Sequence, residues 1–301
     1  MPIALVAVFA ALGVFAALFV AVWVASVRRA RRSAGPPEPA TEEGLPTLFQ
    51  TAIGFVVTFF DTLGIGSFAT TTSVYKLRQV VPDQLIPGTL NVGITAPTVA
   101  QALIYISIIR ADLRTLALMI AAAVAGAWLG AGIVAGWPRR NIQIGMGVAL
   151  LLAAILMLST QLALFPVGGD ALGVSGARMA IALLGNFALG ALMTLGIGLY
   201  APCMILVSLL GMNPAVAFPI MMGSCAFLMP VASIRFIRKR RYALRAALGL
   251  TLGGIPAVLL AAFIVRSLPL GAVRWLVVCV VLYTAASMLR SARAEAPTQV
   301  S

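Results

Sequence analysis

The sequence predicts an all-α integral membrane protein made of two inverted-topology repeats and one extra N-terminal helix. Of its 301 residues, 61% are hydrophobic and only 10% are charged, and the mean hydropathy is +1.06, which is far above that of a water-soluble domain. Several uncharged runs of about 20 residues are long enough to cross a bilayer core of roughly 30 Å as helices. A five-residue motif recurs together with its surroundings, which indicates an internal duplication.

Residues 1–27 are predicted to form the first transmembrane helix, with the amino terminus outside the cell. No basic residue precedes the apolar run, and Arg28, Arg29, Arg31 and Arg32 follow it at once. Such flanks favour an uncleaved helix over a secretory signal. Residues 28–45 are then predicted to be a cytoplasmic linker, because a stretch rich in Pro, Glu and Ala cannot pack into a core.

The duplication is anchored by Thr-Leu-Gly-Ile-Gly at residues 62–66, which recurs unchanged at residues 194–198. The same offset of 132 aligns an alanine, a leucine and two prolines, so that nine of 26 positions are identical. Each copy is expected to hold a broken helix or re-entrant pair, whose second piece ends near Gln79 or Gly211, followed by three transmembrane helices. These helices are predicted at about 83–109, 113–137 and 141–164, and at about 213–237, 244–265 and 271–289.

Three full crossings per copy is an odd number, so the second copy must start on the opposite side of the membrane from the first. The domain boundaries that follow are repeat 1 at 46–164, an external loop at 165–178, repeat 2 at 179–290 and a cytoplasmic tail at 291–301. This topology places 16 basic residues in the cytoplasm and five outside, as the positive-inside rule requires. The predicted location is the cell (inner) membrane, with a cytoplasmic carboxyl terminus.

Composition also excludes several functions. The chain has no histidine, and its three cysteines follow no metal-ligand spacing, so neither a metal nor another cofactor is expected. Its basic residues lie in short clusters between apolar runs, which argues against a nucleic-acid partner.

The two Gly-Ile-Gly breaks are the candidate binding site. Broken helices near the bilayer midplane expose backbone donors, and a helix N-terminus favours negative charge, so the pair predicts a site for a small anion. The alternative is that each Gly-x-Gly serves only close helix packing. The candidate substrate-binding residues are Thr62, Gly64, Gly66, Ser67, Thr70, Asn91, Thr194, Gly196, Gly198, Tyr200, Cys203 and Ser224.

Asp61 is the one acidic residue that the prediction places inside an apolar helical stretch, and its partner in the second copy is Met193. A carboxylate in that position is costly, so it is a candidate either for proton coupling or for capping backbone N–H groups of the turn. Thr98 and Gln101 lie farther along and are interpreted as interhelical hydrogen-bonding residues. Three small-residue faces are predicted helix contacts: Gly126-x-x-x-Gly130, Gly132-x-x-x-Gly136 and Gly249-x-x-x-Gly253.

Residues 59–93 and 194–227 each combine the Gly-Ile-Gly turn, a short helix, a proline-containing bend and a following helix. This repeated pattern resembles the sulfite exporter TauE/SafE family, over roughly residues 54–289. The chain departs from that family after the second glycine, where Ser67-Phe68 and Leu199-Tyr200 replace a run of glycines. The resemblance implies transport of sulfur-containing anions such as sulfite, thiosulfate or organosulfonates, often outward.

The predicted function is therefore a secondary transporter, in the export direction, for a small sulfur-containing anion. Two alternatives stay open: a passive anion channel, and an intramembrane aspartyl enzyme that would use Asp61 but lacks the second carboxylate such chemistry needs. The expected partners are the anion and the lipid bilayer, and a homodimer is left open.

Overall fold

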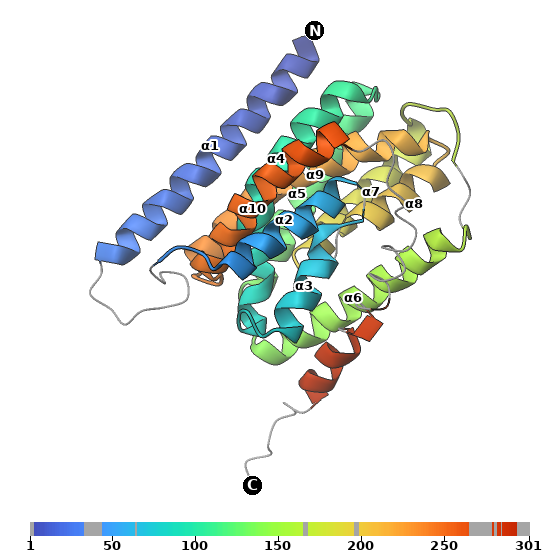
Figure 1. Cartoon of the computed structure of the whole chain (residues 1–301). Helices are drawn as coiled ribbons and strands as arrows, with labels where there is room; N and C mark the ends of the chain where they lie inside the picture. The colour runs from blue at the N-terminus through green and yellow to red at the C-terminus, as the bar shows by residue number, and fades with distance from the viewer. Residues whose placement is uncertain are drawn as a thin grey trace.

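The computed structural model describes residues 3–32, 44–63, 65–164, 168–195, 199–264, 279, 282–283 and 285–293. Within these ranges the regular elements are all helices (Figure 1). In chain order they are α1 (Ile3–Arg32), α2 (Leu48–Thr62), α3 (Ser67–Leu77), the 3-10 helix η2 (Asp83–Leu85), α4 (Ile86–Ile108), α5 (Leu113–Val134), α6 (Arg139–Gln161), α7 (Gly176–Met193), α8 (Tyr200–Leu209), the 3-10 helix η3 (Pro214–Val216), α9 (Ala217–Arg238) and α10 (Leu244–Ile264).

Seven described segments are long and apolar enough to cross a membrane, which confirms an all-α integral membrane protein. They comprise α1, η2 with α4, α5, α6, α7, η3 with α9, and α10. Five of the six transmembrane helices predicted within the copies agree with the structure to within a few residues. The sixth, at 271–289, lies mostly outside the described residues, of which 285–293 are helical. The helix α1 continues to Arg32, so residues 28–32 extend it instead of starting the linker.

Both broken segments fold back on themselves. The guanidinium of Arg78, just after α3, lies 5.8 Å from the ring centroid of Phe49 at the start of α2, so α3 returns to the end of the molecule where α2 began. In the second copy, Asn213 after α8 donates its N–H to the carbonyl of Ala171 before α7, at 2.8 Å. At 15 residues, α2 is about 22 Å long, too short to span alone. Each segment ends on the side of the molecule where it began and is therefore called a re-entrant helical pair, although α7 is itself long enough to cross a membrane.

Corresponding helices of the two copies pack against each other in an exchanged pattern. Helix α4 packs on α9, its counterpart, while α2 packs on α10 and α7 packs on α5. Helices α4 and α9 are antiparallel, because Tyr105 near the end of α4 stacks on Phe218 at the start of α9, with ring centroids 5.1 Å apart. At the other end, Ala243 after α9 donates its N–H to Thr89 Oγ1, at 2.9 Å. This exchange is what a two-fold relation in the membrane plane would produce.

Glycines allow the helices of these pairs to approach closely. A Cβ added at Gly54 on α2 would lie 2.6 Å from the carbonyl oxygen of Gly249 on α10. Gly253 meets α2 in the same way, and Gly126 and Gly130 meet the backbone of α7. The predicted helix-contact role of these glycines is confirmed, because a side chain at any of them would push the paired helices apart.

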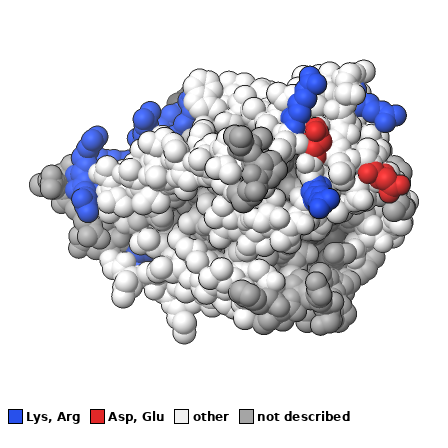
Figure 2. Space-filling model, turned by 90° about the horizontal axis from the view of Figure 1, so that it is seen from above, with Lys and Arg blue, Asp and Glu red and all other residues white. Residues whose placement is uncertain are grey.

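Charged side chains gather at the two ends of the molecule, with an uncharged belt between them in the view of Figure 2. We call the end that holds Leu45, Thr89 and Ala243 the basic end, because the loop 238–241 there contains only Arg and Lys. The opposite end holds Asp112, whose N–H bonds the carbonyl of Leu172 at 2.9 Å. Helix α1 runs along the outside of the bundle between these two ends (Figure 1).

Candidate functional site between the two re-entrant pairs

The turn between α2 and α3 is closed by Asp61. Helix α2 ends at Thr62, and Gly66 starts α3 with a φ of +86°, a backbone conformation that favours glycine. The carboxylate of Asp61 accepts the N–H of Ser67, the first residue of α3, at 2.6 Å. An ionised carboxylate is stabilised at a helix N-terminus because free N–H groups and the helix dipole both point at it. Of the two roles considered for Asp61, the structure contains the cap.

A second helix holds the same carboxylate from the other side. The amide of Gln101 on α4 donates to Asp61 Oδ2 at 3.0 Å and to Thr62 Oγ1 at 2.9 Å. Tyr105, one turn further along α4, donates its hydroxyl to the carbonyl of Thr62. The Oε1 atom of Gln101 is buried and has no hydrogen-bond partner among the described residues. Gln101 is thus the interhelical hydrogen-bonding residue that was predicted, but its main partner is the candidate proton-coupling group.

A small cavity lies where the two re-entrant pairs meet. Its volume is about 20 Å³, enough for about one water molecule. It is lined by Asp61, Gly66, Ser67, Phe68, Thr98, Met193, Leu199, Met221, Met222 and Cys225. Because these residues come from α2, α3 and α4 on one side and from α7, the start of α8 and α9 on the other, both copies build the cavity.

The two walls of the cavity differ in chemistry. The wall from the first copy carries the carboxylate of Asp61, the hydroxyl groups of Ser67 and Thr98, and the N-terminus of α3. The wall from the second copy is rich in sulfur, and there the thiol of Cys225 lies 3.6 Å from the thioether of Met193. The chemistry of the two walls therefore matches a solute with a polar end and a soft, polarisable end.

Several predicted site residues lie at or beside this cavity. Gly66 and Ser67 line it, and Thr62 is tied to it through Gln101. The hydroxyl of Thr70 donates to its own helix, at 2.8 Å from the Ser67 carbonyl, and that of Thr194 donates to the Ala191 carbonyl at 2.7 Å. These two hydroxyl groups therefore cap their own backbone.

Three other predicted residues lie away from this cavity. Asn91 is buried in α4 and donates to the carbonyl of Pro87 at 2.8 Å, and its Oδ1 has no partner among the described residues. Ser224 pairs with the amide of Asn186 at 3.0 Å, in the contact between α7 and α9. Cys203 is fully buried in the first turn of α8. None of these three is among the cavity-lining residues.

For four predicted residues, the structure leaves the whole residue or its side chain undescribed. Gly64, Gly196 and Gly198 lie outside the described residues, and Tyr200 begins α8 but its side chain is not described. Seven lining residues were not among the predicted site residues: Phe68, Thr98, Met193, Leu199, Met221, Met222 and Cys225. Thr98 had been interpreted as an interhelical hydrogen-bonding residue, and the structure places it in the cavity wall instead. Apolar residues that face lipid and those that face a cavity look alike in such a sequence, so no pattern separates them.

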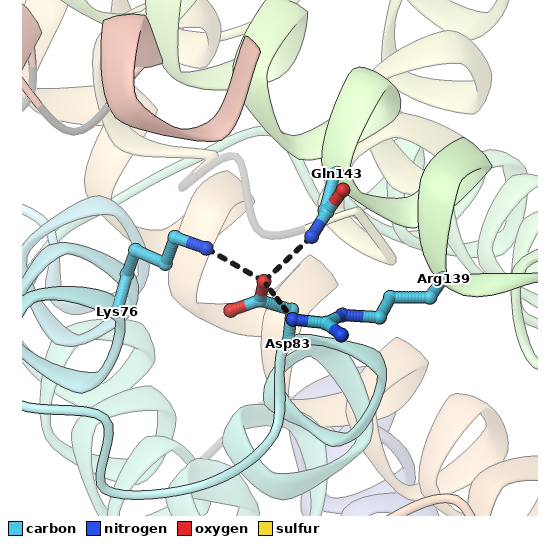
Figure 3. A network of polar contacts seen from close by, with 4 residues as sticks. All are labelled: Lys76, Asp83, Arg139 and Gln143. Atoms are coloured by element: carbon cyan, nitrogen blue, oxygen red, sulfur yellow. Dashed lines mark hydrogen bonds and ion pairs between the residues drawn. The ribbon is translucent and has the colours of Figure 1, made fainter. Parts of the chain in front are cut away.

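A second polar cluster, also missed, ties α3 to α6 near the basic end (Figure 3). Asp83 Oδ2 lies 2.6 Å from Lys76 Nζ, 2.9 Å from Gln143 Nε2 and 3.8 Å from an Arg139 guanidinium nitrogen. The side chains of Lys76 and Asp83 are 13% and 8% exposed, whereas that of Arg139 is 51% exposed. The second copy has Ser208 and Ala215 at the positions of Lys76 and Asp83, so the cluster has no counterpart there.

Six described membrane-length helices outside the broken segments, two re-entrant pairs and a cavity built jointly by two copies define a helical membrane transport protein. Comparison with protein families identifies it further: the sulfite exporter TauE/SafE family matches the chain over residues 3–157. That match covers more than half of the chain, and the chain therefore belongs to this family, whose members are transporters and not enzymes. The alternative of an intramembrane aspartyl enzyme is thereby removed. Comparisons with curated proteins and with solved structures found no match.

Proposed function

We propose that the chain exports a small sulfur-containing oxyanion, such as sulfite or a short organosulfonate, through the cavity between the two re-entrant pairs. The observation that carries the proposal is the place of Asp61. Its carboxylate occupies the N-terminus of α3 inside that cavity, where a substrate anion would find the same backbone and amide donors. The family membership supports the sulfur chemistry.

Competition for these donors couples the anion to a proton. A substrate anion and an ionised Asp61 cannot share the Ser67 N–H and the Gln101 amide without strong like-charge repulsion. Protonation of Asp61 removes its negative charge and frees the donors for the substrate. Anion binding and proton binding therefore assist each other, which is the condition for moving the two together.

The direction then depends on net charge. A doubly charged anion that moves with one proton carries one negative charge, and a membrane potential negative inside drives this charge outward by about 2.3 kcal/mol per 100 mV. A singly charged anion with one proton would be neutral and would follow the proton gradient instead. The membrane potential therefore drives export of dianionic sulfite by this mechanism, whereas an organosulfonate, a monoanion, would leave only down its own concentration gradient.

The cavity must enlarge during the cycle. At about 20 Å³ it has room for about one water, so the described conformation is closed around the site. We assign the basic end to the cytoplasm by the positive-inside rule, with the amino terminus outside and the carboxyl terminus inside. The antiparallel pairing of α4 with α9 supports the inverted-repeat architecture, in which movement of one copy against the other opens the site to either side.

The test is anion flux in proteoliposomes with a defined pH gradient and membrane potential. Wild-type protein should move labelled sulfite at a rate that rises as the potential becomes more negative inside and that depends on pH. Asp61→Asn imitates the protonated state, so its flux of thiosulfate, a dianion that does not titrate near neutral pH, should become independent of pH while binding persists. Asp170→Asn, which changes an exposed carboxylate before α7, is the matched control and should keep the wild-type pH dependence.

Two results would contradict the proposal at separate points. Equal pH dependence in wild type and Asp61→Asn would remove the coupling role. Absence of flux for sulfite, thiosulfate and a short alkylsulfonate, with flux for a carboxylate such as acetate, would remove the substrate class. Unitary currents in planar bilayers would favour the passive channel over the transporter.

A further inference from the structure

A deep apolar groove separates the N-terminal half of α1 from α5 and α9. Its volume is about 900 Å³, and the side chains that line it are all aliphatic or aromatic. They include Val8 and Ala11 on α1, Ala121 on α5 and Phe227 on α9. Such walls offer water no hydrogen bonds, so water is a poor occupant of the groove. Hydrocarbon is a favourable one, because covering apolar surface stabilises by a free energy of roughly 25 cal/mol for each Å².

The groove extends along α5 from the end near Arg110 to the ring of Trp128. Along α5 it runs from Leu113 to Trp128, which is about 22 Å at the helical rise. Leu113 also lines a second pocket of about 520 Å³, together with Ser107 and Arg110. This pocket lies at the end of the molecule that holds Asp112, away from the basic end. At the other extreme of the groove, the guanidinium of Arg235 lies 4.0 Å over the ring of Trp128. The groove is long enough for one acyl chain, and Arg110 lies beside one of its ends.

We propose that this groove binds one phospholipid from the leaflet at the Arg110 end, with its phosphate at Arg110 and one acyl chain along α5. Arg110 is exposed, and no ion pair within the described part of the chain uses it. A guanidinium binds phosphate oxygens through two parallel hydrogen bonds. One leaflet contributes about 15 Å of a hydrocarbon core of roughly 30 Å, so the groove is deep enough for a whole chain.

The contacts distinguish this lipid from the bulk bilayer. The outer side of α1 meets lipid as an open face, where Val14 and Leu18 are 56% and 55% exposed. In the groove, a chain would touch three helices at once and gain dispersion contacts on every side. Its binding would also join α1 to the bundle beyond the edge-to-face contact of Phe15 with Phe227, whose ring centroids are 5.3 Å apart. The lipid proposal requires only that the protein lies in a membrane. Its test is therefore independent of which anion the protein transports.

The experiment measures the fluorescence of Trp128 in the full-length protein. Trp128 is kept as the sole tryptophan by replacing Trp23, Trp137 and Trp275 with Phe, and the delipidated protein in detergent is titrated with phosphatidylglycerol that carries brominated acyl chains. Trp128 fluorescence should be quenched in a saturable manner at one lipid per chain. Native mass spectrometry of the same samples should count one retained lipid.

Variants then test whether the lipid binds in the groove or elsewhere on the protein. Ala121→Phe fills the groove and should weaken lipid binding at least tenfold, as should Ala117→Phe one turn away, which serves if the first variant folds poorly. Ala188→Phe, on an exposed part of α7, is the matched control and should bind as the unmodified sole-tryptophan protein does. Arg110→Gln should weaken binding several-fold with the quenching at saturation unchanged.

Three results would overturn the proposal. Quenching that rises without saturation would show bulk lipid contact only. Equal lipid retention by Ala121→Phe and Ala188→Phe would place the lipid elsewhere. A dimer in the mass spectrum that Ala121→Phe abolishes would assign the groove to a second copy of the chain instead.

Discussion

At the scale of single residues, Gly66 sets the geometry of the site. Its φ of +86° is accessible to glycine at little cost, and a Cβ added there would meet no atom within 4 Å. The cost of Gly66→Ala is therefore conformational and not steric. We expect the folded state to lose about 1–3 kcal/mol, measured by thermal or denaturant unfolding in detergent.

Gly13 in α1 is the matched control for this substitution. A Cβ there also meets nothing within 4 Å, but the residue is helical, where alanine is favoured over glycine by roughly 1 kcal/mol. Gly13→Ala should be neutral or stabilising. If Gly66→Ala were equally harmless, the positive φ at the turn would carry no strain, and the account of the break would be wrong.

Asp112 shows a pH effect whose sign can be worked out. As the N-cap of α5 it accepts hydrogen bonds from the side chain and the N–H of Thr115, and these bonds hold the pKa of its carboxyl below the usual range. A lowered folded pKa stabilises the protein above the unfolded value of about 3.9, and this contribution is lost as the pH falls through the folded pKa. Asp112→Ala should cost about 1 kcal/mol at neutral pH, with the difference from wild type shrinking in acid. A difference that stayed constant from pH 7 to pH 3, measured by unfolding, would contradict the role of the charge.

Only those site residues that a local sequence motif marks could be predicted. Gly66 and Ser67 were found because the turn and the start of the next helix are formed by consecutive residues. The bond from Gln101 to Asp61 joins positions 40 residues apart, so it depends on how α4 packs against α2. Met193 and Met221 gave no signal, because a bilayer makes both the lipid face and the interior of a helix apolar.

At the scale of elements, the Lys76–Asp83 pair fixes the end of α3 against η2 and α6. Asp83→Asn leaves the ammonium of Lys76, only 13% exposed, without its carboxylate, and should destabilise the protein by about 3 kcal/mol. Arg139→Gln removes a partner that is 51% exposed and 3.8 Å away, and should cost less than about 1 kcal/mol. Denaturant unfolding of the two variants measures both values.

A double variant tests whether the cost comes from the unpaired charge. Lys76→Met with Asp83→Leu removes both ions, so it should be more stable than Asp83→Asn alone. If its destabilisation equalled the sum of those measured for Lys76→Met and Asp83→Leu separately, the pair would not interact. If Asp83→Asn cost no more than Arg139→Gln, burial of the pair would not matter.

The elements themselves were largely predictable, because a run of about 20 apolar residues has few alternatives to a spanning helix. Helix α5 starts at Leu113, as predicted from the apolar run that opens there, whereas its N-cap, Asp112, was not predicted. The return of α3 toward the start of α2 was not predictable. A short helix after a glycine turn satisfies its backbone whether it spans or returns, and only the contact of Arg78 with Phe49 distinguishes the two.

At the scale of the whole molecule, the inverted relation of the two copies gives the sharpest remaining prediction. Arg110 lies between α4 and α5, and Arg240 lies in the corresponding turn between α9 and α10. If the copies are inverted, these matched turns face opposite sides of the membrane. Arg240 belongs to the basic end, which the positive-inside rule assigns to the cytoplasm.

Single cysteines at these two positions test this in intact cells, after Cys203, Cys225 and Cys279 are replaced by Ser. A thiol reagent that cannot cross membranes should label Arg110→Cys from outside and should label Arg240→Cys only after the membrane is opened. Asp170→Cys, in the exposed segment before α7, should behave like Arg110→Cys, because both lie at the end opposite the basic one. Labelling of Arg110→Cys and Arg240→Cys from the same side would mean parallel copies. Movement of one inverted copy against the other could then not open the site to either side, and the proposed transport cycle would lose its basis.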